Sequence, residues 1–221
     1  MSLSLLSLIQ ATGGTLRVGA SSLDRAAAPG AGQTRLAAPQ QVVIDSRQVA
    51  AGDVFWALPG KHADGAEFIE HAFARGAAGV VTQQTGIEPP AGRWLIEVTC
   101  ATTALSKLAE HRRERFAGTV IGVTGSVGKT STRELIRAAL SGRFATLASP
   151  RNYNNQLGLP LSMLGLRPGV EYAVLEMGAS AVGEIAQLAR QCRPHWGVIT
   201  SLADAHLEGF GGPGGVTAAK T

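Results

Sequence analysis

Cysteine is scarce in this chain of 221 residues, which has only Cys100 and Cys192. The two lie far apart and form no Cys-x-x-Cys or Cys/His cluster, so the sequence indicates neither a disulfide framework nor a zinc site. This usage is typical of a reducing compartment, and we expect a cytoplasmic protein.

Long apolar segments are also missing. Residues 1–10 are apolar, but they lack a basic leader, and Gly13 and Gly14 follow shortly, as at the end of a helix. No stretch approaches the roughly 20 apolar residues that a bilayer-spanning helix needs. We therefore predict a short amphipathic N-terminal helix and a soluble protein without a membrane span.

Charge of one sign is not concentrated anywhere. The net charge is +4, and the basic residues are spread along the chain. A nucleic-acid groove needs a concentrated basic face, so we expect small anionic ligands and no nucleic acid. Aromatic residues make up 5% and hydrophobic residues 45%, which suits an Ala/Gly/Leu-rich α/β protein of one large or two small domains.

The strongest motif in the sequence is Thr-Val-Ile-Gly-Val-Thr-Gly-Ser-Val-Gly-Lys-Thr-Ser-Thr at residues 119–132. A β-branched run leads into a glycine-rich turn and then into an apolar-periodic helix, which is the order strand, phosphate loop, helix. Backbone N–H groups and a helix N-terminus can bind phosphates, a lysine can meet the β- and γ-phosphates, and a threonine hydroxyl can ligate Mg²⁺. The residues predicted to bind a nucleoside triphosphate are Gly125, Ser126, Gly128, Lys129, Thr130 and Ser131.

The motif departs from the strict P-loop pattern at one position. Val123 stands where that pattern has its first glycine, and Gly122 precedes it by one residue. The alternative is a glycine-rich turn between strand and helix with an incidental lysine. The flanking strand and helix favour nucleotide binding.

The first hundred residues predict a small α/β unit. We expect a loop over residues 15–41, strands at 42–47, 52–58, 79–82 and 94–98, and a helix from Phe68 to Phe73 that ends at Gly76. Asp45-Ser46-Arg47 and Lys61-His62 follow strands, where open α/β sheets bind ligands. Taken alone, these residues equally fit a turn with a solvated ion pair and a structural histidine.

The rest of the chain predicts a doubly wound sheet. We expect helices at 102–116, 129–140, 157–166 and 184–191, and strands at 119–124, 144–148, 171–177 and 196–200. In the first helix we interpret the run His111–Arg115 as a solvated face. In the second we predict that Leu135, Ile136, Ala139 and Leu140 form the buried side.

Two polar features in this region are candidates for ligand binding. Glu176 ends a predicted buried strand near the phosphate loop, where a carboxylate commonly holds Mg²⁺. Its alternative is an acid that caps the helix beginning near Gly183. The loop 151–156 contains three asparagines, whose amides either bind a ligand or simply favour the turn.

Together these segments resemble the Mur ligases. The resemblance covers nearly the whole chain and rests on Asp45-Ser-Arg47, Gly52-Asp-Val-Phe-Trp-Ala-Leu-Pro-Gly-Lys61, Thr124-Gly-Ser-Val-Gly-Lys-Thr-Ser131, Asn152-Tyr-Asn-Asn155, Glu176-Met-Gly-Ala-Ser180 and Ala205-His-Leu-Glu-Gly-Phe-Gly211. It implies an N-terminal α/β domain for a UDP-linked substrate at residues 1–100. It also implies an incomplete, P-loop-type parallel-sheet domain for ATP at residues 101–221, with a third domain absent and the chain itself a doubtful catalyst.

The resemblance also implies roles for individual residues. Ser46, Arg47, Lys61 and His62 would lie at the uridine-diphosphate site, and Asn152 and Asn155 beside the active site. Lys129 and Thr130 would hold ATP phosphates and Mg²⁺. Glu176 and His206 would serve magnesium ions, and Lys220 stands where family members carry an active-site lysine, carbamylated in several to bind a second Mg²⁺.

The implied reaction is ATP-dependent amide formation through an acyl phosphate in bacterial peptidoglycan synthesis. Within the family, the motifs most resemble the member that joins D-alanyl-D-alanine to UDP-N-acetylmuramoyl-tripeptide, acting as a cytoplasmic monomer. The alternatives are a member that adds a single amino acid and a non-catalytic nucleotide- or UDP-sugar-binding module. Departures from the family pattern are Ser201, where asparagine is expected, Ala66, where histidine is usual, and the glycine-rich residues 212–215.

Overall fold

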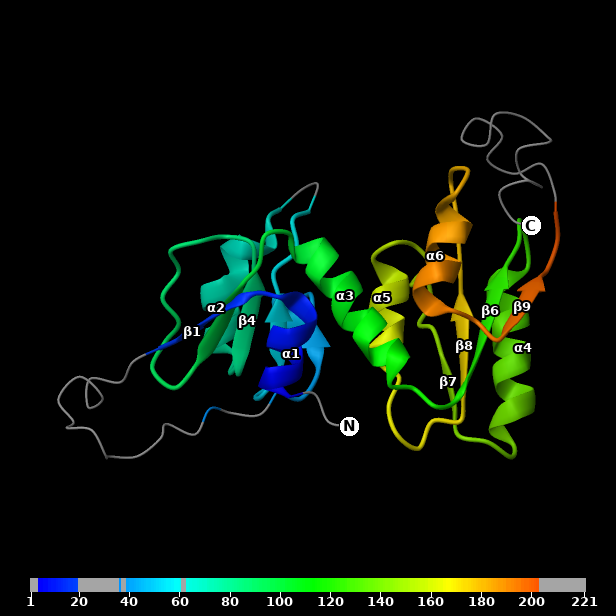
Figure 1. Cartoon of the computed structure of the whole chain (residues 1–221), viewed down its shortest axis with the longest axis horizontal. Helices are drawn as coiled ribbons and strands as arrows, with labels where there is room; N and C mark the ends of the chain where they lie inside the picture. The colour runs from blue at the N-terminus through cyan, green and yellow to red at the C-terminus, as the bar shows by residue number, and fades with distance from the viewer. Residues whose placement is uncertain (1–3, 20–35, 37–38, 61–62, 203–221) are drawn as a thin grey trace. The chain divides into compact units, whose positions relative to one another are not determined.

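The computed structural model describes residues 4–19, 36, 39–60 and 63–202 (Figure 1). The chain divides into two compact units, Met1–Lys107 and Leu108–Thr221, and each is built on its own β-sheet. Both sheets are mainly parallel and carry helices, so the predicted α/β class with parallel sheets is confirmed. Among the described helices, none has the length and apolarity to cross a membrane.

The first unit holds a five-stranded sheet in the order β1-β5-β4-β3-β2. Strand β1 is antiparallel to β5, and the other neighbours are parallel. The elements are α1 (Leu5–Thr12), β1 (Thr15–Val18), β2 (Val42–Val43), η1 (Ser46–Gln48), β3 (Val54–Trp56), η2 (Gly65–Phe68), α2 (Ile69–Ala74), β4 (Gly79–Thr82) and β5 (Trp94–Glu97).

Alternation along β3 explains how this sheet buries both faces. Phe55 belongs to one buried apolar cluster with Ile69 of α2, Val80 of β4 and Leu95 of β5. Trp56 points the other way, as period-two side chains must, and its indole Nε1 donates to the Ala101 carbonyl at 2.9 Å. Buried parallel strands of this kind read as continuous apolar runs, which is why the sequence predicted β3, β4 and β5 correctly.

Two predictions for the first unit were wrong. Residues 15–18 form strand β1 and not a loop, because Thr15 to Val18 pair in register with Glu97 to Trp94. This partner is about 80 residues away, and no local pattern reveals it. The strand predicted at 42–47 is confined to β2, since Asp45 accepts from the Arg47 backbone N–H and begins η1.

The second unit holds a four-stranded parallel sheet in the order β7-β8-β6-β9. Its elements are β6 (Thr119–Thr124), α4 (Lys129–Ser141), β7 (Thr146–Ala148), α5 (Gly158–Met163), β8 (Tyr172–Glu176), α6 (Glu184–Cys192) and β9 (Trp196–Ile199). The chain moves outward from β6 to β7 and then back across the sheet, so right-handed crossovers place α4 on one face and α5 and α6 on the other (Figure 1). The doubly wound arrangement is thus confirmed.

Helix α3 (Ala101–Glu114) precedes this sheet. The prediction that its charged end is a solvated face was wrong for one residue. Arg113 is buried; its Nε donates to the Cys192 carbonyl at 2.6 Å and its Nη2 to the Arg193 carbonyl at 2.7 Å. Arg193 follows α6 with a left-handed φ of 43°. The guanidinium therefore caps the C-terminal end of α6, where carbonyls lack helical partners.

The predicted buried side of α4 was wrong for Leu135 and Ala139, whereas Ile136 and Leu140 are half-buried. Leu135 is 71% exposed and Ala139 is exposed, whereas the buried residue of this helix is Arg133. The apolar core of the unit lies mainly on the other face of the sheet, around Leu159, Met163 and Leu188. Helical periodicity locates an apolar stripe, but it does not say which side of the helix the sheet covers.

Candidate functional site

The phosphate-loop motif forms a tight turn between β6 and α4. Gly125 has φ 144° and Gly128 has φ 86°, a region that side chains rarely adopt. A Cβ at Gly125 would collide with the Thr200 hydroxyl, so glycine is required there for space as well as for conformation. The two glycines allow the chain to reverse within four residues and to begin α4 at Lys129.

Helix α4 begins without a side-chain cap, since Gly128 offers none. Its N-terminal N–H groups and dipole therefore favour an anion. The Lys129 Nζ lies over the loop and donates to the carbonyls of Gly125 at 2.8 Å and Ser126 at 3.2 Å. The ammonium group is thus beside the helix terminus, where a phosphate would need it.

The residues after β9 hold the other side of the loop. The Ser201 carbonyl accepts from the Ser126 N–H at 2.9 Å, and the Ser201 hydroxyl accepts from the Val127 N–H at 3.0 Å. Ser201 stands where the family pattern has asparagine, and here it contacts the loop directly. Two N–H groups of the phosphate loop are engaged in this way, so a phosphate bound by them would have to exchange these bonds.

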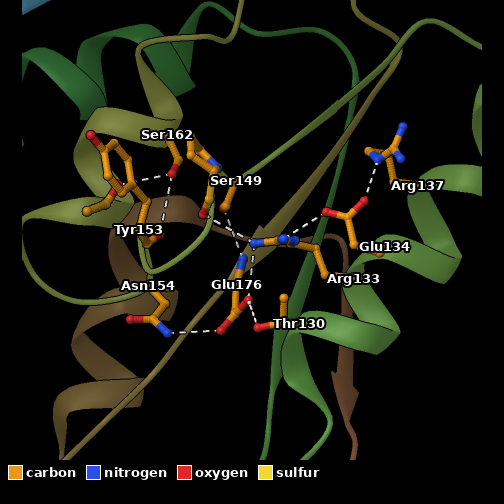
Figure 2. Close-up of polar contacts among 11 residues, drawn as sticks. Thr130, Arg133, Glu134, Arg137, Ser149, Tyr153, Asn154, Ser162 and Glu176 are labelled. Carbon is orange, nitrogen blue, oxygen red and sulfur yellow. Dashed lines mark hydrogen bonds and ion pairs between the residues drawn. The ribbon is translucent and has the colours of Figure 1, made fainter.

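Glu176, at the end of β8, is buried and held at both carboxylate oxygens (Figure 2). Oε2 accepts from the Thr130 hydroxyl at 3.0 Å and from Arg133 Nη1 at 3.2 Å, and Oε1 accepts from Asn154 Nδ2 at 2.9 Å. The alternative role as a helix cap is wrong. The N–H groups of Ser180 and Ala181, just before α6, bind Glu184 instead.

The oxygens of Thr130 and Glu176 fit a magnesium ion. A hydroxyl and a carboxylate are hard oxygen ligands of the kind that Mg²⁺ prefers, and the hydrogen bond between them places the two oxygens side by side, 3.0 Å apart. The part of the chain that is described contains no cluster of three or more His, Cys, Asp or Glu side chains that could hold a metal ion by itself. Such a site suits Mg²⁺, which usually takes one or two protein oxygens together with phosphates and water.

The asparagine loop supplies a residue that sequence reasoning did not single out, Asn154. Its amide holds Glu176, whereas the Asn155 Oδ1 accepts from the N–H groups of Leu157 and Gly158 at the start of α5. Asn152 is exposed, with a left-handed φ of 65°. The repeated asparagines were a signal for this loop, but they did not show which amide faces the carboxylate.

The candidate substrate residues of the first unit lie around η1. Asp45 binds the Arg47 guanidinium at 2.7 Å, which with the Arg47 backbone N–H lowers the pKa of Asp45 to about 2. Ser46 is buried, and its hydroxyl lies 3.0 Å from Nδ1 of His71 on α2, a histidine that the sequence did not suggest. Arg47 is 83% exposed, so its outer face is open to a ligand.

A cavity of about 710 Å³ also lies in the first unit, but neither Ser46 nor Arg47 lines it. Its lining comes from α2 and from the segment before β5, including Phe73, Ile87 and Arg93. The predicted site residues Lys61, His62, His206 and Lys220 lie outside the described residues. Ser131 is exposed in the first turn of α4, next to Thr130.

Comparison with known protein families gives two matches. Residues 123–221 match the family described as Mur ligase middle domain, and residues 40–113 match the one described as Mur ligase family, catalytic domain. The two matches together span most of the chain and include both the phosphate loop and the Asp45–Arg47 segment.

Similar curated proteins include the UDP-N-acetylmuramoyl-tripeptide--D-alanyl-D-alanine ligases of Bacillus subtilis and Synechocystis. The former is 38% identical over 179 residues and the latter 40% over 182 residues; each alignment covers 81% of this chain. The chain spans 39% of the length of these relatives.

Similar solved structures include MurF from Acinetobacter baumannii, with a TM-score of 0.83 and 33% identity over 100% of this chain and 45% of that one. MurF ligase from Thermotoga maritima in complex with ADP has a TM-score of 0.72 and 37% identity over 81% of this chain and 42% of that one. The curated relatives and the solved structures thus point to the same kind of ligase.

Proposed function

The chain belongs to the Mur ligase family, and we propose that it serves the ATP-dependent ligation of D-alanyl-D-alanine to UDP-N-acetylmuramoyl-tripeptide. The observation that carries the proposal is the partly buried hydrogen bond between Thr130, at the start of α4, and Glu176, at the end of β8, beside an uncapped helix N-terminus. Relatives named for this reaction, and one solved with ADP, support it.

In this proposal the second unit binds MgATP. The Lys129 ammonium moves from the loop carbonyls to the phosphates, and the N-terminal N–H groups of α4 donate to them. Thr130 and Glu176 hold a magnesium ion, which would neutralise charge on the phosphates as phosphoryl transfer requires. His206 and Lys220 are proposed to complete the metal sites.

The first unit is proposed to bind the UDP end of the peptide substrate. The exposed guanidinium of Arg47 can donate two parallel hydrogen bonds to a phosphate. Ser46, Lys61 and His62 are proposed to contribute to the same site. Asn152 and Asn155 are proposed to lie near the reacting groups. We also place the protein in the bacterial cytoplasm, as a monomer.

The chemistry would proceed in two steps. The carboxylate of the tripeptide attacks the γ-phosphorus of ATP, giving an acyl phosphate and ADP; the amine of D-alanyl-D-alanine then attacks the acyl carbon and phosphate leaves. ATP and the UDP-linked tripeptide are both anionic, so the contribution of Lys129 is to position the γ-phosphate and to offset charge.

The test is ADP release by the protein expressed from the complete open reading frame, supplied with MgATP and UDP-N-acetylmuramoyl-tripeptide. We expect release that depends on D-alanyl-D-alanine, and that falls at least about 100-fold in Lys129→Ala. Release driven instead by meso-diaminopimelate or lysine would indicate another member of the family. Nucleotide binding with no turnover for any amine would contradict a ligase and favour a binding module.

A further inference from the structure

Arg133 is a buried cation that the proposed reaction does not use. Its side chain is 2% exposed, on a helix whose Leu135 is 71% exposed. Nη1 donates to Glu176 Oε2 and to the Pro150 carbonyl, both at 3.2 Å, and Nη2 donates to Glu134 Oε1 at 2.7 Å (Figure 2). Burying a guanidinium is costly unless it is paired, so this pairing needs a reason.

The guanidinium shares one oxygen with the proposed magnesium site. Oε2 of Glu176 accepts from Thr130 and from Arg133. A divalent cation between Thr130 and Glu176 would therefore lie within a few ångströms of the Arg133 guanidinium, whose side chain and that of Glu176 are only 2% and 3% exposed. Repulsion between the two cations is strong at such a separation. Arg133 therefore opposes binding of a metal ion that arrives without a nucleotide.

We propose that Arg133 is the resident counter-cation of Glu176. It balances the buried carboxylate while the site is without nucleotide, and it keeps the affinity for free divalent cations low. The metal then enters together with a polyphosphate, whose negative charge outweighs the repulsion. The inference rests on the proposed function only in taking Glu176 as a ligand of the nucleotide-bound magnesium.

A purely structural role for the Arg133–Glu176 ion pair would give a different response of stability to added metal. If Arg133 only tied α4 to β8, its loss would lower stability and added metal would not restore it. If Arg133 stands in for a cation, its loss leaves a buried carboxylate that a divalent cation can pair with. Metal-dependent recovery of stability without nucleotide separates these two roles.

The experiment compares thermal unfolding of the wild-type chain and Arg133→Gln, without nucleotide, with and without about 10 mM MgCl₂ or MnCl₂. The wild-type midpoint should move by less than about 1 °C on adding metal. Arg133→Gln should unfold about 5–10 °C lower without metal and recover at least half of that loss with it. Titration with Mn²⁺ should show at least about tenfold tighter binding to the variant.

The matched control is Arg137→Gln. Arg137 lies one turn along α4, binds Glu134 at 2.7 Å and is 44% exposed, so its loss should produce no response to metal. The double variant Arg133→Gln/Glu176→Gln removes both charges and should regain most of the stability while losing the metal response. This variant keeps the test decisive if Arg133→Gln alone fails to fold.

An Arg133→Gln protein that is destabilised but unaffected by Mg²⁺ and Mn²⁺ would overturn the proposal, as would a double variant no more stable than the single one. Titration of the same variants with MgADP reports separately on the proposed function. Metal rescue of Arg133→Gln in a protein that binds no MgADP would leave the counter-cation role standing and count against the ligase.

Discussion

Glu176 shows how single residues build the candidate site. Thr130 and Arg133 hold one of its oxygens and Asn154 holds the other, so the carboxylate has one orientation at the end of β8. The Ser149 hydroxyl accepts from the Glu176 backbone N–H at 3.1 Å and fixes the main chain as well. These partners fix where the carboxylate oxygens lie, and a cation bound between Thr130 and Glu176 would replace the hydrogen bond that now joins them.

The two cysteines provide a prediction at the same scale. Hydrogen bonds from Thr103 lower the pKa of the exposed Cys100, whereas burial raises the pKa of Cys192 to about 11. Because the thiolate is the reactive form, iodoacetamide at about pH 8 should alkylate Cys100 and leave Cys192 intact in the folded chain. Peptide mass spectrometry measures both sites.

Denaturant should make Cys192 react, and Cys100→Ser should remove labelling of the native protein. Lowering the pH from about 8 to 6 should slow the reaction at Cys100, because its thiolate fraction falls. Native alkylation of Cys192 at a rate similar to that of Cys100 would contradict its burial beside Met177.

At the scale of elements, the ends of β6, β8 and β9 together form the candidate site. In register, Val123 of β6 lies beside Glu176 of β8 and Val198 of β9. The phosphate loop, the carboxylate and Ser201 therefore leave neighbouring strands at one edge of the sheet. This is where open parallel sheets bind ligands, at the point where the strand order reverses.

The tie between α3 and α6 gives a prediction for the fold. Arg113→Met should lower the free energy of unfolding by about 2–4 kcal/mol, because it leaves the carbonyls of Cys192 and Arg193 without their charged donor. Urea unfolding followed by circular dichroism measures the change.

Arg115→Met is the matched control, at the residue directly after α3. Its exposed guanidinium contacts only His111 among the partners shown, so the change should stay within about 0.5 kcal/mol. Equal destabilisation by the two variants would show that Arg113 acts through general helix electrostatics and not through the end of α6.

Most elements could be predicted from the sequence because their signals are local. The β-branched run before Gly125 and the apolar run ending at Glu176 identify β6 and β8, and Gly76 correctly marks the end of the helix at 65–74. Strand β1 could not be predicted, since it pairs with β5, about 80 residues further along the chain. The burial of Arg133 and Arg113 was missed for a related reason: their partners lie 43 and 79 residues away.

The site was predicted in part. The motif identified Lys129, Thr130 and Glu176, and the structure brings Thr130 and Glu176 into contact. Asn154 and His71 were missed because each acts through a tertiary contact, with Glu176 and with Ser46 respectively. Charge pairing across elements leaves little trace in a single sequence.

At the scale of the whole molecule, the chain combines two α/β units with separate candidate binding residues. The first presents Ser46 and Arg47 after β2, and the second presents the phosphate loop and Glu176. Each set follows the carboxyl end of a strand in a parallel arrangement, which is where open α/β sheets bind ligands. Binding of a magnesium nucleotide by the second unit is the property on which the proposed function depends most.

Calorimetric titration of MgADP into the chain of 221 residues tests this claim most directly. We predict saturable binding of MgADP to the wild type. Binding should be about 10- to 100-fold weaker in Lys129→Ala, because a charge-assisted contact to phosphate is lost. Binding should be unchanged in Lys107→Ala, whose side chain is exposed on α3. Equal affinities for MgADP in the wild type and Lys129→Ala, or no binding to the wild type, would contradict it.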